Sequence, residues 1–157
     1  MRRNPTAGID IDAPLDTVWE VMLDTARYGE WNSFLRRIEC PSPPSVGDPI
    51  HLHVVFPGRT REVTSPERIS IIDPPRSDGA GVRRATLAYD YEGIPAKLGL
   101  VRGRRWQRLT QEPDGPTRYE TVEEFSGPLV FLAGPDRVQA GFEAHAEGLK
   151  TRAESPR

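Results

Sequence analysis

Hydrophobic and polar residues alternate with a period of two along most of this chain. Ile9 and Ile11, for example, alternate with Asp10 and Asp12, which predicts a strand with one buried face. The same pattern recurs in later segments, which are separated by turns rich in proline and glycine. The alternation therefore predicts about seven strands, in segments 9–12, 34–39, 49–57, 59–73, 83–91, 104–112 and 118–125.

Helical spacing replaces this alternation near both ends of the chain. Pro14 fits a first helical turn, and an apolar stripe at helical spacing follows it. Towards the C-terminus, Val138, Phe142, His145 and Leu149 recur at intervals of three and four residues, which predicts a long last helix. The order of the strands and helices predicts an α+β fold in layers.

Three segments are predicted to interrupt the regular elements. DPPRSDGAG, from residue 73, reads as a loop, and GIPAKLGLVRG, from residue 93, reads as an irregular insertion that could act as a lid. Gly134 and Pro135 predict a break between the apolar piece LVFLA and the last helix.

The length and composition predict one cytoplasmic domain over residues 1–157, with an ordered fold over about 5–154. The net charge of −2 and the scattered arginines favour neither nucleic acid nor acidic membranes as partners. No apolar run approaches the roughly 20 residues of a membrane span, and no hydrophobic region follows MRRNPTAG as in a signal peptide. The single cysteine, Cys40, excludes an internal disulfide and fits a reducing compartment.

Two stretches near the ends of the chain resemble a known superfamily. In IDIDAPLDTVWEVMLDTARYGEWNSFLRRIE, Tyr28, Trp31 and Phe34 follow the predicted helix within seven positions. The second stretch combines TRYETVEEFSGPLVFL with GFEAHAEGLKTRAE, a Glu-x-Phe-x-Gly strand end followed by an apolar segment and a helix that opens on Gly-Phe. In this order the stretches are similar to the START-like polyketide cyclase and dehydratase superfamily, also called SRPBCC.

This resemblance implies the helix-grip fold. In that fold a curved antiparallel sheet of about seven strands wraps around a long C-terminal helix, two short helices follow the first strand, and an internal cavity holds a ligand. The resemblance also implies a hydrophobic small-molecule substrate or ligand. We expect a monomer or a homodimer, and the cyclisation chemistry that the family performs requires no metal or organic cofactor.

Several functions are compatible with that fold, because one fold hosts many activities. The first hypothesis is a polyketide cyclase or dehydratase that acts on a polyketide intermediate. Only two of the 21 basic residues are lysines, which indicates a GC-rich genome such as those of antibiotic-producing bacteria. The second hypothesis is a non-catalytic carrier or sensor of a lipid or aromatic molecule. A chaperone-regulating module is a weaker third hypothesis, since no charged or amphipathic outer surface supports it.

Glu123 and Arg105 are the first candidate catalytic residues. Glu123 shares a strand face with Phe125 and is predicted to face inward, where it either finds a partner or has its pKa raised by burial. Arg105 stands where many bacterial relatives carry a histidine in the sixth strand. If it faces inward, it either pairs with Glu123 or stabilises an enolate oxygen together with Tyr119. Alternation does not decide whether Arg105 or Trp106 faces the interior.

His145 is a further candidate for proton transfer, because it lies on the apolar stripe of the helix that the fold places over the cavity. The alternative is a half-buried histidine that bonds to a strand carbonyl. The residues expected to contact the ligand are mostly aromatic and lie on predicted inner faces or near the cavity entrance. They are Trp31, Phe34, Phe56, Tyr89, Tyr91, Gln107, Phe125 and Phe142. Their alternative role is packing in the core.

His51 and His53 form the one pattern that suggests a metal. Two histidines separated by one residue can bind a metal ion, but no third ligand stands at a usual spacing. Ile50, Leu52 and Val54 make the opposite face of this strand the better candidate for the interior. The sequence therefore predicts exposed histidines and no metal site.

Overall fold

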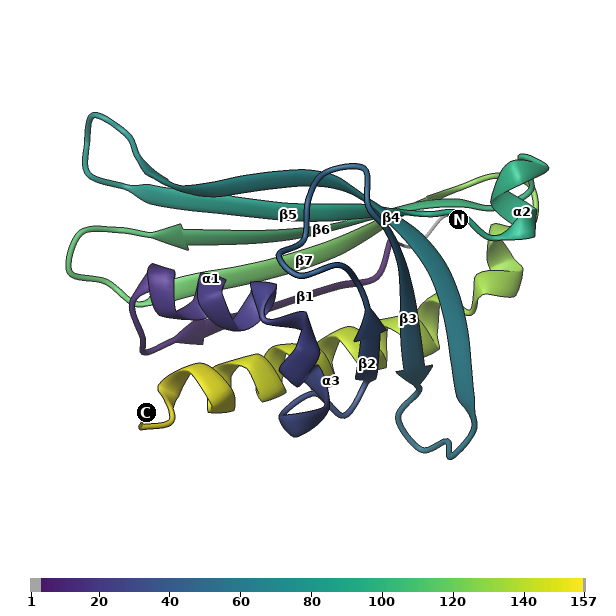
Figure 1. Cartoon of the computed structure of the whole chain (residues 1–157), viewed down its shortest axis with the longest axis horizontal. Helices are drawn as coiled ribbons and strands as arrows, with labels where there is room; N and C mark the ends of the chain where they lie inside the picture. Colours follow the sequence, from purple (N-terminus) through teal and green to yellow (C-terminus); the bar gives the residue numbers. More distant parts are fainter. Residues whose placement is uncertain (1–3, 157) are drawn as a thin grey trace.

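The computed structural model describes residues 4–156, so the outermost residues of the domain predicted over 1–157, including the start of MRRNPTAG, lie outside it. Within this range one antiparallel sheet has the strand order β1-β7-β6-β5-β4-β3-β2. The sheet curves around the last helix, α3 (Pro135–Glu154), as Figure 1 shows, and this arrangement confirms the predicted helix-grip fold of the α+β class. The strands are β1 (Thr6–Ile11), β2 (Leu35–Glu39), β3 (Pro49–Val55), β4 (Glu62–Ser77), β5 (Arg83–Tyr91), β6 (Arg102–Gln111) and β7 (Thr117–Ser126).

The two short helices expected after the first strand are α1 (Leu15–Leu23) and the 3₁₀ helix η1 (Thr25–Glu30). Pro14 stands immediately before α1, where its missing N–H costs no hydrogen bond. The predicted apolar stripe of α1 is buried at Val18, Trp19 and Met22. These side chains belong to the same core as those that α3 buries.

Helix α3 begins where the sequence predicts a break. Gly134 has a φ of 65°, a left-handed conformation that glycine adopts without strain, and Pro135 is the first residue of the helix. The face of α3 that contains Phe142, His145 and Leu149 is buried, as the helical spacing predicts. No helix in residues 4–156 has both the length and the apolar character that crossing a bilayer requires.

Strand β4 is longer than predicted. The sequence predicts that DPPRSDGAG is a loop from residue 73, but β4 continues to Ser77. The pairing of β4 with β5 shifts register between Asp73 and Arg76, so Pro74 and Pro75 lie at an irregularity. Because proline cannot donate to a neighbouring strand, a bulge is where a sheet tolerates it. The alternation of side chains did not reveal this extension.

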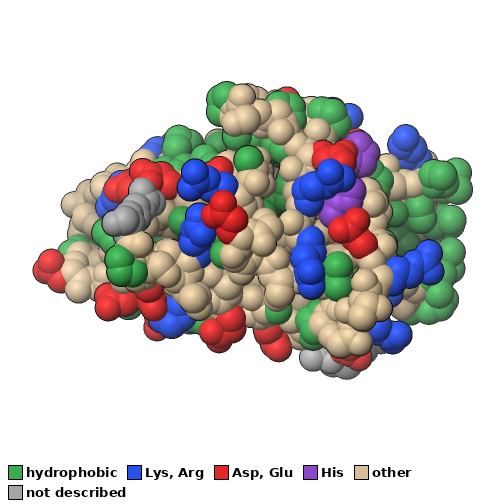
Figure 2. Space-filling model, turned by 60° about the horizontal axis from the view of Figure 1, so that its bottom comes forward, with side chains coloured by type: hydrophobic (Ala, Val, Ile, Leu, Met, Phe, Trp, Pro, Cys, Tyr) green, Lys and Arg blue, Asp and Glu red, His purple; other side chains and the backbone are tan. Residues whose placement is uncertain are grey.

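The predicted insertion GIPAKLGLVRG contains a short helix, α2 (Ile94–Lys97), and the start of β6. A second short helix, η2 (Val130–Ala133), lies at the same end of the molecule (Figure 1). The Leu129 amide between β7 and η2 donates to the Leu100 carbonyl at 3.0 Å, which joins the two segments. Figure 2 shows hydrophobic side chains gathered at this end. The side chains of four residues in these two segments are 62–72% exposed: Ile94, Leu98, Phe131 and Leu132.

Candidate functional site

A cavity of about 360 Å³ lies between the curved sheet and α3. Most of its wall is apolar and comes from strands β3 to β7, helix α3 and the two segments at the exposed hydrophobic end. Leu132 lines the cavity and is also 62% exposed, so the cavity reaches the surface at η2. The apolar and aromatic lining includes Phe34, Leu52, Val54, Phe56, Tyr89, Tyr91, Pro95, Leu100, Val101, Phe125, Leu129, Leu132, Val138 and Phe142.

Arg105 faces this cavity from β6, which settles the orientation that alternation left open. It is 3% exposed and stands opposite Tyr89 of β5 and Glu123 of β7 in the sheet register. Trp106 lies on the outer face, where the guanidinium groups of Arg104 and Arg108 stack on its ring at 5.5 and 4.4 Å from the centroid. Register therefore places Arg105 between two polar side chains of the inner face.

The Arg105 guanidinium is held by hydroxyl groups rather than by a carboxylate. Its Nε donates to Thr121 Oγ1 at 3.0 Å, and its Nη1 donates to the Tyr89 hydroxyl at 3.0 Å. A longer contact of 3.4 Å joins Nη2 to the Tyr119 hydroxyl. The guanidinium also stacks on Phe142 of α3, 4.0 Å from the ring centroid. Three strands and the last helix thus fix the position of this cation.

Two carboxyl groups line the same cavity. Glu123 is 9% exposed, and its carboxyl group makes no hydrogen bond or ion pair with any residue of the range 4–156. Burial raises its pKa to about 8, although the charge of Arg105 opposes this rise. Burial also raises the pKa of Glu67 of β4 well above its usual range, and repulsion from Glu123 adds to the effect. Both groups therefore favour the neutral carboxylic acid more than an exposed glutamate does.

Glu67 is a cavity residue that is not among the site residues predicted from the sequence. It lies two positions before Ile69, which is 3% exposed, so alternation places both side chains on one strand face. This alternation is the signal in the sequence that indicates an inward Glu67. Ser65 Oγ donates to Glu67 Oε1 at 3.0 Å.

Two of the predicted site residues lie behind Arg105 rather than in the cavity wall. The Tyr119 hydroxyl donates to Gln107 Oε1 at 2.8 Å, and both side chains are almost fully buried. This bond commits the Tyr119 proton to Gln107, while the Tyr119 oxygen faces Arg105. Tyr119 and Gln107 thus connect the cation to the core of the sheet.

His145 also lies outside the cavity wall. Asn32 Oδ1 accepts the amide N–H groups of Phe34 and Leu35 at 3.0 and 2.8 Å, so the Asn32 NH₂ group points the other way, towards His145 Nδ1 at 3.0 Å. An amide donor on Nδ1 leaves the proton of a neutral imidazole on Nε2, which has no hydrogen-bond partner in the described part of the chain. Burial, and to a smaller extent the charge of Arg105, lowers the pKa of His145 well below its usual value. The ring is therefore neutral and stacks 5.9 Å from the Tyr119 ring.

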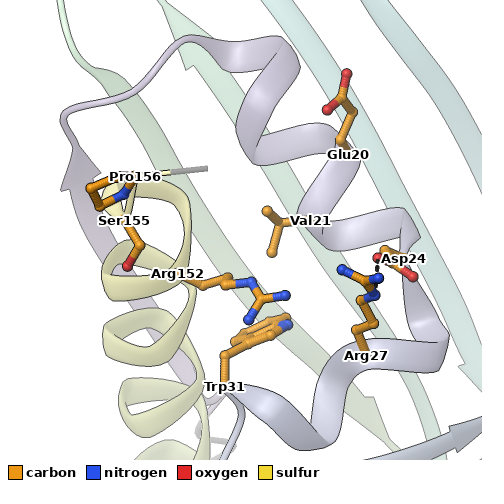
Figure 3. A pocket seen from close by; sticks show the side chains of 8 residues that line it. All are labelled: Glu20, Val21, Asp24, Arg27, Trp31, Arg152, Ser155 and Pro156. Atoms are coloured by element: carbon orange, nitrogen blue, oxygen red, sulfur yellow. Dashed lines mark ion pairs between the residues drawn. The ribbon is translucent and has the colours of Figure 1, made fainter.

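Trp31 contacts a different hollow from the one that Phe34 lines. Its ring lies 5.5 Å from the His145 ring on one side and lines a pocket of about 520 Å³ on the other. Figure 3 shows this pocket between α1, η1 and the end of α3, with the Arg152 side chain next to the Trp31 ring. Arg152 Nη2 also forms an ion pair with Glu30 at 2.6 Å. Most of the side chains that line this pocket are polar or charged, in contrast to those of the apolar cavity.

The His51 and His53 strand face points away from the cavity. The prediction of exposed histidines holds for His51 but is wrong for His53, which is 8% exposed beneath the side chains of Glu39 and Glu62. His53 Nδ1 lies 3.2 Å from Glu62 Oε2, and its Nε2 lies 3.1 Å from Glu39 Oε1 and from Arg37 Nη2. Among residues 4–156 no group of three histidine, cysteine, aspartate or glutamate side chains is placed to bind a metal ion. The expectation of a metal-free protein stays a prediction.

The structure therefore gathers most of the predicted site residues in one place and leaves four of them outside the wall. Those in the wall are Phe34, Phe56, Tyr89, Tyr91, Arg105, Glu123, Phe125 and Phe142. Trp31, Gln107, Tyr119 and His145 lie next to this group or behind it. Arg105 and Glu123 stand opposite each other in the sheet, but they form no ion pair within the described residues, so the pairing alternative is not observed.

A curved sheet closed by one helix over an apolar cavity defines a helix-grip domain. The chain belongs to the family described as polyketide cyclase / dehydrase and lipid transport, whose sequence model matches residues 4–154. No curated protein sequence matches the chain. The resemblance to the START-like superfamily is thus confirmed.

Solved structures share the fold at low sequence identity. The Zhui aromatase/cyclase from Streptomyces sp. R1128 is 19% identical with a TM-score of 0.67, over 97% of this chain and 93% of that one. Truncated norcoclaurine synthase from Thalictrum flavum is 14% identical with a TM-score of 0.65, over 99% and 95%. A STAR-related lipid transfer protein from Xanthomonas axonopodis is 14% identical with a TM-score of 0.63, over 96% and 85%.

Proposed function

We propose that this protein is a polyketide cyclase or dehydratase that binds a hydrophobic aromatic-polyketide intermediate in the cavity and promotes its aldol cyclisation or dehydration. The observation that carries the proposal is the convergence of Arg105, Tyr89, Glu123 and Glu67 in one apolar cavity, without an ion pair among these side chains in the described chain. Polar groups that satisfied one another would favour a passive pocket. The family match and the likeness to an aromatase/cyclase support the same class of reaction.

Glu123 is the proposed group for proton transfer. With a pKa of about 8, roughly a tenth of this carboxyl is ionised at pH 7, and that fraction can take a proton from the acidic methylene between two ketones. The enolate carbon then bonds to a second carbonyl carbon of the same chain. The carboxylic acid returns its proton to the new alkoxide, which becomes a hydroxyl group. For dehydration, the Glu123 carboxylate takes a second proton from the carbon next to the hydroxyl-bearing carbon, and an acid in the cavity protonates the hydroxyl group, which leaves as water while the C=C bond forms. Glu67 is the proposed second acid in the cavity.

Arg105 and Tyr89 are the proposed donors for the enolate oxygen. A guanidinium that is already fixed stabilises developing negative charge without reorganisation, and exclusion of water strengthens the effect. The Tyr89 oxygen accepts from Arg105, which leaves its own proton for a ligand oxygen. In this scheme Tyr119 and Gln107 position Arg105, and Asn32 and His145 position the wall behind it.

The aromatic wall is proposed to hold the substrate in a folded conformation. Phe34 packs against Phe56 and Phe142, at 5.6 and 6.2 Å between ring centroids, and Phe125 and Tyr91 extend the wall. A folded chain places its reacting carbons close together, which by itself accelerates an intramolecular reaction. The proposed reaction needs no cofactor. The proposal includes a cytoplasmic location, a role in antibiotic biosynthesis and a monomeric or homodimeric state.

The alternative is a non-catalytic carrier or sensor of a lipid or aromatic molecule. The exposed side chains of Ile94, Leu98, Phe131 and Leu132 beside the cavity opening favour it, because an apolar rim suits the transfer of a hydrophobic guest. The likeness to a STAR-related lipid transfer protein points the same way.

The test compares wild-type protein with Glu123→Gln and Glu124→Gln on a synthetic aryl tetraketone, with formation of the dehydrated aromatic product followed by liquid chromatography. Loss of the proton-transfer group should lower the protein-dependent rate by about 10²–10⁴-fold. Glu124 lies next to Glu123 on the exposed face of β7, so its variant should keep the wild-type rate. Equal product formation with and without wild-type protein would refute the enzymatic function and favour the alternative of a non-catalytic carrier or sensor.

A further inference from the structure

Arg105 is a buried cation without an anionic partner. Its hydrogen bonds go to the neutral hydroxyl groups of Thr121, Tyr89 and Tyr119, and no carboxylate of residues 4–156 forms an ion pair with it. By contrast, Arg104, its neighbour on the outer face, binds both oxygens of Asp90 at 2.6 and 2.9 Å. A buried charge is costly unless it is paired, so the missing partner of Arg105 requires an explanation.

The nearby carboxyl groups do not supply the missing charge at neutral pH. Glu123 and Glu67 share the cavity with Arg105, and burial raises the pKa of both, that of Glu123 to about 8. Most of the Glu123 population is therefore protonated at pH 7. At neutral pH the charge of Arg105 is therefore largely uncompensated when the cavity holds no ligand.

The donors that remain free point to a single acceptor group. An arginine has five N–H donors, of which three are directed at the hydroxyl groups named above. The Tyr89 hydroxyl receives one of them, so its own proton is available beside the two remaining guanidinium protons. A carboxylate matches this set, because its two oxygens accept several hydrogen bonds and its one negative charge balances one guanidinium.

We infer that the cavity takes a hydrophobic molecule that carries one carboxylate, and that Arg105 and the Tyr89 hydroxyl bind this carboxylate while the aromatic wall encloses the apolar body. The inference rests on the proposed function in one respect, that the substrate lies in this cavity. It assigns the free donors of Arg105 and Tyr89 to a carboxylate of the bound molecule in place of the enolate oxygen, and so narrows the ligand class to acids. A volume of about 360 Å³ suits a compact aromatic acid with two or three rings.

The experiment measures binding of 2-naphthoic acid and of 2-naphthamide at pH 7 by isothermal titration calorimetry. The two probes have the same apolar body and nearly the same shape, but only the acid is charged. Wild-type protein should bind the acid at least tenfold more tightly than the amide. Equal affinities, tighter binding of the amide, or binding of neither probe at millimolar concentration would overturn the inference without any variant.

Two variants assign the effect to Arg105. Arg105→Gln should reduce the preference for the acid to less than threefold while the amide still binds, which shows that the cavity is intact. Arg108→Gln changes an exposed arginine on the outer face of the same strand and should keep the full preference. If Arg105→Gln does not fold, Tyr89→Phe provides the comparison, with an expected loss of about fivefold in the preference. A variant that folds and retains the wild-type preference contradicts the assignment.

The tetraketone assay on the same preparations separates the two proposals. If the wild-type protein prefers the acid but does not convert the tetraketone, the carboxylate site is supported and the proposed enzymatic function is refuted. If the wild-type protein converts the tetraketone but binds both probes equally, the enzymatic function is supported and the carboxylate site is refuted.

Discussion

Replacement of Glu123 by glutamine should stabilise the protein, and increasingly so as the pH rises. The folded-state pKa of Glu123 is about 8, against 4.5 for the free side chain, so between these values the folded protein binds more protons than the unfolded chain does. The free energy of unfolding of the wild type must therefore fall as pH increases through this window. Glutamine is neutral at every pH and has nearly the shape of the protonated acid, so Glu123→Gln escapes this loss.

The expected difference follows from the two pKa values. Integration over pH gives a gain in the free energy of unfolding of about 1 kcal/mol at pH 5, about 3 kcal/mol at pH 7 and about 5 kcal/mol at pH 9. At pH 4 both forms are neutral and the difference should vanish. For a chain of this size, about 3 kcal/mol corresponds to a rise of roughly 6–12 °C in Tm.

Urea unfolding followed by tryptophan fluorescence at pH 4, 5, 7 and 9 measures this difference. Glu124→Gln is the matched control, because Glu124 is exposed on the opposite face of the same strand and should give no pH-dependent change. A difference between wild type and Glu123→Gln that does not change with pH would refute the argument. The same pattern in the control would refute it too.

Two further changes test the surroundings of the cavity. Asn32→Ala removes the acceptor of two buried backbone amides and the donor to His145, and should lower the free energy of unfolding by about 3 kcal/mol in urea. The control is Ser33→Ala at the neighbouring exposed position, which should lower the free energy of unfolding by less than about 0.5 kcal/mol. A similarly small loss for Asn32→Ala would contradict the role assigned to the Asn32 side chain. Val54→Trp should fill part of the cavity and abolish the binding of 2-naphthoic acid measured by calorimetry. The larger side chain should lower the free energy of unfolding by about 1–3 kcal/mol. Unchanged affinity would mean that the probe binds elsewhere.

The polar groups of the cavity destabilise the fold that contains them. Arg105, Glu67 and Glu123 are buried, and no described carboxylate pairs with Arg105. Replacement of such groups by neutral ones commonly stabilises a protein, while groups that serve a ligand are retained at the expense of stability. The expected gain in stability of Glu123→Gln and its expected loss of turnover therefore have the same physical origin.

The sequence by itself determined the elements and the face of most side chains. Alternation gave the strands, helical spacing gave α1 and α3, and the pattern Glu-x-Phe placed Glu123 on the same face as Phe125. These features depend on residues a few positions apart, which is the range over which a local pattern carries information. The pattern did not extend β4 through Pro74 and Pro75, because there the partner strand β5 maintains the pairing.

Only the tertiary structure decided which of these side chains meet. The register of three strands places Arg105 between Tyr89 and Glu123, and the register of β4 against β5 brings Glu67 opposite Tyr91. The packing of α1 and η1 against the end of α3 places Trp31 in a separate pocket, as Figure 3 shows. Register and curvature arise from packing between segments that are tens of residues apart, and a shift of one residue would turn a whole strand face outward. For that reason no local pattern in the chain encodes them.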